Sequence, residues 1–180
     1  MMNIREKYNK EVVSVLKKQL GLANDLEVPK IKKVVVNVGI GKFIKDSAQV
    51  EDVFKSLETI TGQKPIKTKA RLSIAGFKIR EGLEVGMKVT IRGKRMWNFL
   101  DRFVGASLPR VKDFNGIKKS SVDSNGNLNM GIKEHLIFPE ILPEEVKNIF
   151  PLEVTVVTDA KNNKEGLELF KLLGFPFEKK

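Results

Sequence analysis

The sequence contains no cysteine, one histidine, one tryptophan and one tyrosine among its 180 residues. The lack of cysteine excludes disulfides, thiol catalysis and cysteine-ligated metals, and it fits a reducing compartment. With a single histidine, only carboxylates remain as metal ligands, and they are scattered along the chain. We therefore expect no bound metal, no cofactor and no catalytic residues.

Long apolar runs are also missing. No run approaches the roughly 18 residues that a membrane-spanning helix needs, and the N-terminal stretch MMNIREKYNKE lacks the apolar core of a secretion signal. Hydrophobic residues still make up 41% of the chain, enough to build a folded core. We expect neither secretion nor a membrane partner.

Positive charge is abundant and unevenly placed. The formal net charge is +11; residues 1–122 carry +14, whereas residues 123–180 carry −3. The imbalance is steepest between Lys64 and Arg102, where eleven cations face three acids. Such segregation predicts a polyanionic partner for the basic part, although net charge can also serve solubility alone.

Helical periodicity appears in four places. An amphipathic helix is expected over residues 4–20, ending at Gly21, and a second one opens with Asp46 or Ser47 as N-cap and closes at Gly62. The stretches KRMWNFLDRFVG and NKEGLELFKLLG have apolar residues at helical spacing, and Gly174 and Pro176 stop the last helix.

Strand signals lie between the helices. A valine-rich strand is expected over Lys32–Val38, and VGMKVTIRG and PLEVTVVTDA predict two more; QKPIKTK reads as an edge segment, and the Asn125-Gly126 pair predicts a hairpin turn. Because strands and helices mix without a βαβ rhythm, we predict an α+β fold. We expect a single domain over residues 1–180, with a mostly antiparallel sheet, helices packed on one face and a long, mobile basic loop over residues 70–82.

The residues that alternate away from the predicted core are polar: Asn37, Lys88, Thr90, Arg92, Asn129 and Thr155. Amides, hydroxyls and cations suit phosphate oxygens, ribose hydroxyls and base edges, although a sheet face can also be polar because it is wet. Aromatic residues make up only 7%, so folded RNA is a better expected ligand than a stacked single strand. If about six cations meet phosphates, the logarithmic salt slope should be roughly −4 to −5.

Three other features carry alternative functions. The stretch GIGK at Gly39–Lys42 follows a strand and could indicate a phosphate-using enzyme, but it lacks the spacing of a phosphate-binding loop. His135 is expected to be structural or solvated. The stretch FPEILPEE at Phe138–Glu145 could meet a basic partner protein or form a solvated turn.

Several motifs occur in the order found in one known family. They are KKVVVNVGIGK, TGQKPIKTKARLSIAGFKIREGLEVGMKVTIRGKRMWNFLDR, LPRVKDFNGI, GNLNMGIKEHLIFPE and GFPF. Together they cover nearly the whole chain, and they resemble the bacterial type of large ribosomal subunit protein five.

The resemblance implies a structural ribosomal protein in the cytoplasm that is not an enzyme. It implies binding to 5S ribosomal RNA in the central protuberance, contact with the transfer RNA in the peptidyl site, and a bridge to small-subunit protein thirteen. Neighbouring large-subunit RNA and proteins are further implied partners. An RNA chaperone acting outside the ribosome remains the alternative within RNA-binding functions.

The resemblance also assigns residues. For 5S ribosomal RNA the implied contacts are Asn37, Gln63, Lys64, Lys67, Lys88, Thr90 and Arg92. For transfer RNA they are Arg71, Ser73, Phe77, Lys78 and Arg80 in the loop, where Gly76 and Gly82 serve turns. Phe77 at the loop tip can either stack on a ligand or anchor the loop.

Four positions depart from the family pattern. Asn115 stands where arginine is common, and DSNGN replaces a usual Asp-Gly-Arg-Gly-Asn; each change removes a cation near one hairpin. Met87 replaces a frequent cysteine and Trp97 a frequent tyrosine. Both keep apolar bulk, and we expect them to leave function unchanged.

Overall fold

The computed structural model describes residues 3–41, 43–44 and 46–178, apart from the side chain of Glu145. Its contacts group the chain into two compact units. Unit one comprises Met1–Val34, Ile91–Met130 and Thr155–Lys180, and unit two comprises Val35–Thr90 and Gly131–Val154. The expectation of a single domain over residues 1–180 stays a prediction.

One five-stranded sheet runs in the order β2-β3-β1-β5-β4. Its strands are β1 (Ile31–Gly39), β2 (Ile66–Lys69), β3 (Glu84–Ile91), β4 (Leu128–Ile132) and β5 (Leu152–Thr158). β2 and β3 pair antiparallel, and β2 lies at the sheet edge directly after Pro65, as the sequence predicted. The predicted α+β class with a mostly antiparallel sheet is confirmed.

The N-terminal helix is helical throughout the predicted range 4–20, but not uniformly. It consists of α1 (Ile4–Lys7), a π-helical turn (Tyr8–Val12) and α2 (Val13–Leu20), and Gly21 caps it in the left-handed conformation with φ of 64°. Within unit one, the Ile4 backbone N–H donates to the Asp101 carboxylate at 2.7 Å. The predicted helix is therefore confirmed, and the π-helical turn is an addition.

Unit one also holds α4 (Gly93–Arg102), which continues into a second π-helical turn (Phe103–Ser107), and α5 (Asn163–Leu173). The predicted Asn125-Gly126 turn is present: Val122 and Leu128 form an antiparallel bridge across it. Gly126 approaches Gly166 so closely that a Cβ on Gly166 would lie 2.5 Å from Gly126. Only glycine allows this contact between the turn and α5.

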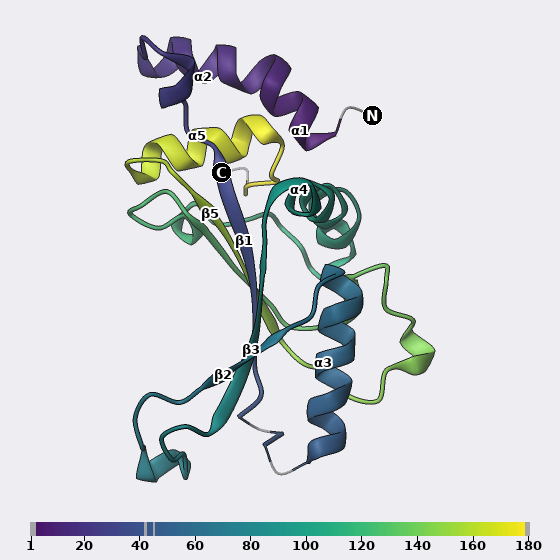
Figure 1. Ribbon diagram of the computed structural model, residues 1–180. Coiled ribbons are helices and arrows are strands. Elements are labelled where there is room, and N and C mark those ends of the chain that lie inside the picture. The colour runs from purple at the N-terminus through teal and green to yellow at the C-terminus, as the bar shows by residue number, and fades with distance from the viewer. Residues whose placement is uncertain (1–2, 42, 45, 179–180) are drawn as a thin grey trace. The chain divides into compact units, whose positions relative to one another are not determined.

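Unit two is built around α3 (Ser47–Thr61) and the β2–β3 hairpin. Asp46 is the N-cap of α3, and its carboxylate accepts hydrogen bonds from the amides of Ala48 and Gln49. The apolar stripe of α3 buries Val53, Leu57 and Ile60. Figure 1 shows the hairpin extending to the loop over residues 70–82, which contains a short 3₁₀ turn (Ala75–Phe77).

The remaining 3₁₀ turns are short. They are Asp25–Glu27, Leu108–Arg110, Lys119–Ser121, His135–Ile137 and Pro143–Glu145. The last two lie in the long segment that leads from β4 to β5, where His135 is fully buried and its ring stacks on Phe150 with centroids 3.9 Å apart. His135 was expected to be either structural or solvated, and the structure shows that it is a buried core residue.

Candidate nucleic-acid interface

Unit two presents one accessible strand face, here called the polar strand face: Asn37, Ile66, Thr68, Lys88 and Thr90. In β1, Val36 and Val38 are buried while Asn37 between them is exposed. In β3, Met87, Val89 and Ile91 are buried while Lys88 and Thr90 between them are exposed and half-buried. The register pairs Ile66 with Lys88 and Thr68 with Gly86, and directly opposite residues share a face of a sheet. The alternation predicted for Asn37, Lys88 and Thr90 is therefore found.

Gln63 and Lys64 lead into this face from the end of α3. The Gln63 side-chain amide donates to the Thr90 carbonyl at 3.2 Å, which ties the turn after α3 to β3. Lys64 is exposed next to it. The structure thus brings Gln63 and Thr90 together, and Lys64 follows Gln63 in the chain.

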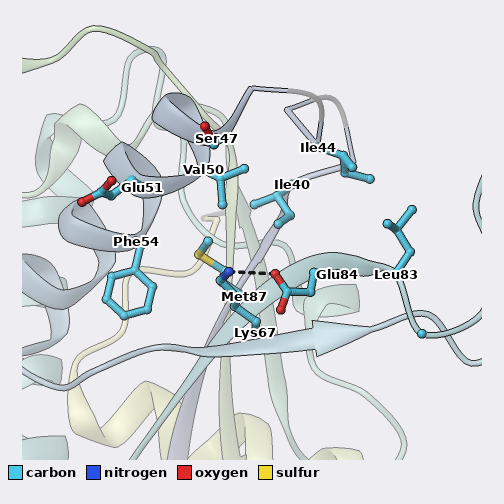
Figure 2. A pocket seen from close by; sticks show the side chains of 11 residues that line it. Ile40, Ile44, Ser47, Val50, Glu51, Phe54, Lys67, Leu83, Glu84 and Met87 are labelled. Carbon is cyan, nitrogen blue, oxygen red and sulfur yellow. Dashed lines mark ion pairs between the residues drawn. The ribbon is translucent and has the colours of Figure 1, made fainter.

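Lys67 lies on the opposite side of the same hairpin. It pairs with Met87 rather than with Lys88, and its ammonium group contacts the Glu84 carboxylate at 2.7 Å. Figure 2 shows this ion pair beside Phe54 and Met87, at a cavity of about 600 Å³. The structure does not bring Lys67 together with Asn37, Lys88 and Thr90.

That cavity is mostly apolar. Its walls come from the end of β1, the first turns of α3 and the hairpin, and they comprise Ile40, Ile44, Ser47, Val50, Glu51, Phe54, Lys67, Gly82, Leu83, Glu84 and Met87. Ile40 and Met87 are fully buried at its inner side, which makes the cavity an extension of the core of unit two.

Three residues of the predicted polar face belong to unit one. Arg92 is exposed and directly precedes α4. On β4 and β5, the Thr155 hydroxyl donates to the Asn129 side-chain oxygen at 2.9 Å, and both residues are half-buried. This pair links two neighbouring strands through their side chains.

The basic loop exposes all five of its predicted contact residues, namely Arg71, Ser73, Phe77, Lys78 and Arg80. It is held by an Ile74–Ile79 bridge and by the Ser73 hydroxyl, which accepts from the Glu81 amide at 2.9 Å. The Phe77 side chain is 75% exposed, which contradicts the anchoring alternative. Lys78 adopts φ of 54°, a left-handed backbone that closes the loop tip.

The GIGK stretch has no phosphate-binding geometry among the described residues. The Ile40 amide donates to the Val85 carbonyl, and α3 begins only at Ser47. The Asp46 carboxylate already accepts from amides at the N-terminus of α3, where a phosphate would need them. Lys42 lies outside the described residues, and no group of three or more potential metal ligands occurs within them.

The acidic stretch at 138–145 forms a mostly exposed turn, with Phe138 buried, Glu144 exposed and Leu142 58% exposed. Of the departures from the family pattern, Met87 is fully buried and Trp97 is half-buried against Tyr8, with ring centroids 6.0 Å apart. Their apolar bulk is used in packing, whereas Asn115 is exposed.

Among the residues that the structure describes, three titratable groups have pKa values shifted from their ordinary values. Burial lowers the pKa of His135, although the Phe150 amide donates to its Nδ1. Burial, with a contribution from Asp159, raises the pKa of Tyr8 to about 12. Burial works to raise the pKa of Asp123, but hydrogen bonds from neighbouring asparagines outweigh it and lower that pKa. None of these groups lies on the polar strand face or in the loop.

Sequence reasoning missed Ile66 and Thr68 as members of the polar strand face. The motif QKPIKTK contains three lysines, and charge drew attention to Lys64 and Lys67. The pairing register with β3 decides which side chains share a face with Lys88, and only a non-local contact supplies that register.

Comparisons with known proteins match nearly the whole chain to one family. A family model described as Ribosomal protein L5 matches residues 24–80, and a model of the C-terminus of the same ribosomal family matches residues 84–177. No helix among the described residues is long and apolar enough to cross a bilayer.

Three curated relatives are named large ribosomal subunit protein uL5. The relative from Geotalea uraniireducens is 49% identical over 98% of this chain and 99% of its own length. Those from Rubrobacter xylanophilus and Colwellia psychrerythraea are each 46% identical; the first covers 98% of both chains, and the second covers 100% of this chain and 99% of its own.

Proposed function

Because the chain belongs to the ribosomal protein L5 family, we propose that it is a structural, RNA-binding constituent of the large ribosomal subunit in the cytoplasm. The role is non-enzymatic. The relatives carry the name of a ribosomal subunit protein, and the chain matches them over its full length.

The proposed RNA ligand of the polar strand face is 5S ribosomal RNA. The observation that carries this assignment is the outward placement of Asn37, Lys88 and Thr90 on one side of two neighbouring strands. An amide, a cation and a hydroxyl can meet ribose hydroxyls, phosphates and base edges without any change in the sheet. Gln63 and Lys64 add contacts from the adjoining segment of unit two, and Arg92 is a further proposed contact that belongs to unit one.

The basic loop is proposed to contact the transfer RNA in the peptidyl site. Its five exposed residues, Arg71, Ser73, Phe77, Lys78 and Arg80, offer three cations, a hydroxyl and an aromatic ring on a protruding segment. Cations hold the RNA backbone, and an exposed ring can stack on a base. Further proposed partners are neighbouring large-subunit RNA and proteins, and small-subunit protein thirteen across an inter-subunit bridge.

A matched pair of lysine substitutions tests the 5S assignment. Lys88→Gln removes a cation from the polar strand face, and Lys67→Gln removes one from the opposite side of the same hairpin. With a 5S ribosomal RNA transcript in a filter-binding assay, Lys88→Gln should weaken binding roughly tenfold, because hydrogen bonds to charged groups contribute about 1.5–3 kcal/mol. Lys67→Gln should stay within about twofold of wild type, because Lys67 faces the other side of the hairpin and its charge is paired with Glu84 and screened by salt.

Equal losses for the two lysine variants would contradict the placement of the 5S contact on this face.

Deleting Ser73–Lys78 should leave binding to the 5S transcript intact and disturb transfer-RNA positioning. Sedimentation of a cell extract tests the alternative of an RNA chaperone: absence of the protein from the large-subunit fraction would remove the ribosomal role. Saturable binding of nucleoside triphosphates in equilibrium dialysis would instead revive the phosphate-using enzyme.

A further inference from the structure

Ile66 is an apolar side chain in an otherwise polar surface. It is 65% exposed, although it lies on a strand and not in a loop. Its cross-strand partner is Lys88, and Thr68 follows it on the same face. A single exposed apolar residue is common on protein surfaces, so the position of Ile66 and not its exposure alone carries the argument.

The surroundings of Ile66 limit what can cover it. It lies on the edge strand, and Lys88 beside it is itself exposed. One position further along this face stands Gly86, which has no side chain and whose Cβ position is blocked by the Thr68 hydroxyl and the Val38 carbonyl. On β1, the space above Gly39 is open, with no atom within 4 Å of a Cβ there. The face is thus covered at Gly86, whereas Ile66, Lys88 and Asn37 are exposed on the three neighbouring strands, so a ligand held by Lys88 and Asn37 comes within reach of the Ile66 side chain.

We infer that Ile66 contacts the RNA bound on the polar strand face through the apolar surface of a ribose or base, and that it adds affinity independent of phosphate charge. This inference rests on the proposed 5S assignment and adds a residue to it. RNA presents apolar surface at its sugar edges and base faces, and the wide, shallow minor groove of an RNA helix displays sugars to a flat protein surface. Phosphate contacts attract any polyanion, whereas a fitted apolar contact requires the RNA to have one particular shape.

The two kinds of contact differ in their response to salt. A lysine that neutralises a phosphate contributes to the slope of log affinity against log salt concentration, by about 0.7–0.9 per phosphate. An apolar side chain releases no counterions, so its removal lowers affinity equally at every salt concentration. The salt slope therefore separates Ile66 from Lys88, although the two residues are paired across the strands.

The test measures binding of the full-length protein to a 5S ribosomal RNA transcript over a series of salt concentrations. Ile66→Ala should bind about tenfold more weakly with an unchanged salt slope, because most of the apolar side chain leaves the contact. Ile66→Thr should also weaken binding, by roughly fivefold, although threonine keeps the β-branch that strands favour. Lys88→Gln serves as the reference that reduces the slope.

Leu26→Ala is the matched control: Leu26 is 81% exposed, but it lies in the Asp25–Glu27 turn of unit one. It should bind like wild type. Unfolding midpoints in urea check that both Ile66 variants are folded. If Ile66→Ala does not fold, Ile66→Thr still provides the test.

Wild-type affinity for both Ile66 variants, with Lys88→Gln still weakened, would overturn this inference and leave the 5S assignment standing. A reduced salt slope in the Ile66 variants would also overturn it, since Ile66 would then act by positioning charge. Wild-type affinity in Lys88→Gln, Asn37→Ala and the Ile66 variants together would refute the 5S assignment itself.

Discussion

The β2–β3 hairpin is close-packed at its base and open at its tip, although both ends carry cations and apolar residues. At the base, Lys67 pairs with Glu84, and Gly86 fits under Thr68 and against β1. At the tip, Phe77, Lys78 and Arg80 extend into solvent. Cations and apolar residues at the base therefore divide between packing and exposure, since Ile66 and Lys88 remain exposed there, whereas those at the very tip are all available to a ligand.

The largest expected effect concerns packing at the base. In Gly86→Ala, the new Cβ would lie 2.7 Å from the Thr68 hydroxyl and 3.1 Å from the Val38 carbonyl, so the Thr68 side chain must move and the β1 backbone must give way slightly. We expect a loss of about 1–3 kcal/mol in the free energy of unfolding, measured by urea denaturation. Gly76→Ala at the tip, where no atom lies within 4 Å of the Cβ position, should stay within about 0.5 kcal/mol of wild type. A larger loss of stability in Gly76→Ala than in Gly86→Ala would contradict the difference in packing between the base and the tip of the hairpin.

The next effect is a pH dependence of stability, and it comes from His135, a buried residue of unit two. The folded protein keeps His135 neutral because burial lowers its pKa, whereas the unfolded chain titrates near the ordinary value of 6.5. Below that pH the unfolded state binds more protons, so stability falls as pH decreases. We expect the free energy of unfolding to fall as the pH decreases below that value, with a slope of at most about 1.4 kcal/mol per pH unit, which is the limit for the uptake of one proton.

The pH dependence in this range can be assigned to one residue, because His135 is the chain's only histidine. His135→Phe should flatten the unfolding free energy over the same pH range, even if its stability at neutral pH is lower. An unchanged slope in the variant would point to a carboxyl group instead.

A smaller effect separates the two roles of lysine in the hairpin. Lys67→Gln removes the ion pair with Glu84, which is partly exposed, and should cost at most about 1 kcal/mol of unfolding free energy. Lys88→Gln should leave the unfolding midpoint unchanged while weakening RNA binding. A loss of stability in Lys88→Gln instead would contradict the placement of Lys67 on the ion-paired face and of Lys88 on the RNA-binding face.

The smallest effect is expected at the loop tip. Phe77→Ala should change the free energy of unfolding by less than about 0.5 kcal/mol, because the ring is mostly exposed. Its effect should appear only in transfer-RNA contact. A loss of more than about 1 kcal/mol in thermal or urea unfolding, well above the change typical of surface sites, would mean that Phe77 anchors the loop.

Local patterns predicted much of the fold. The alternation in VGMKVTIRG identified Lys88 and Thr90 as outward-facing, and Asp46 was one of two expected caps for α3. The π-helical turns at Tyr8–Val12 and Phe103–Ser107 have no comparable signal, because they depend on tertiary packing of the helices that contain them.

The candidate site was predictable to the extent that it depends on alternation within one strand. It was not predictable where it depends on pairing between strands. Lys67 and Ile66 are neighbours in the sequence, yet they face opposite sides, and only the register with Met87 and Lys88 shows which is which. Charge alone had assigned Lys67 to the RNA-binding face, whereas the pairing register places Ile66 on that face.

The edge position of β2 has a consequence for the chain before it meets RNA. One side of β2 pairs with β3, and the other side offers backbone groups to which a second copy could add a strand. Lys64, Lys67 and Lys69 line this edge at and around β2. Two copies that met edge to edge would bring these like charges together, and electrostatic repulsion would oppose lateral self-association.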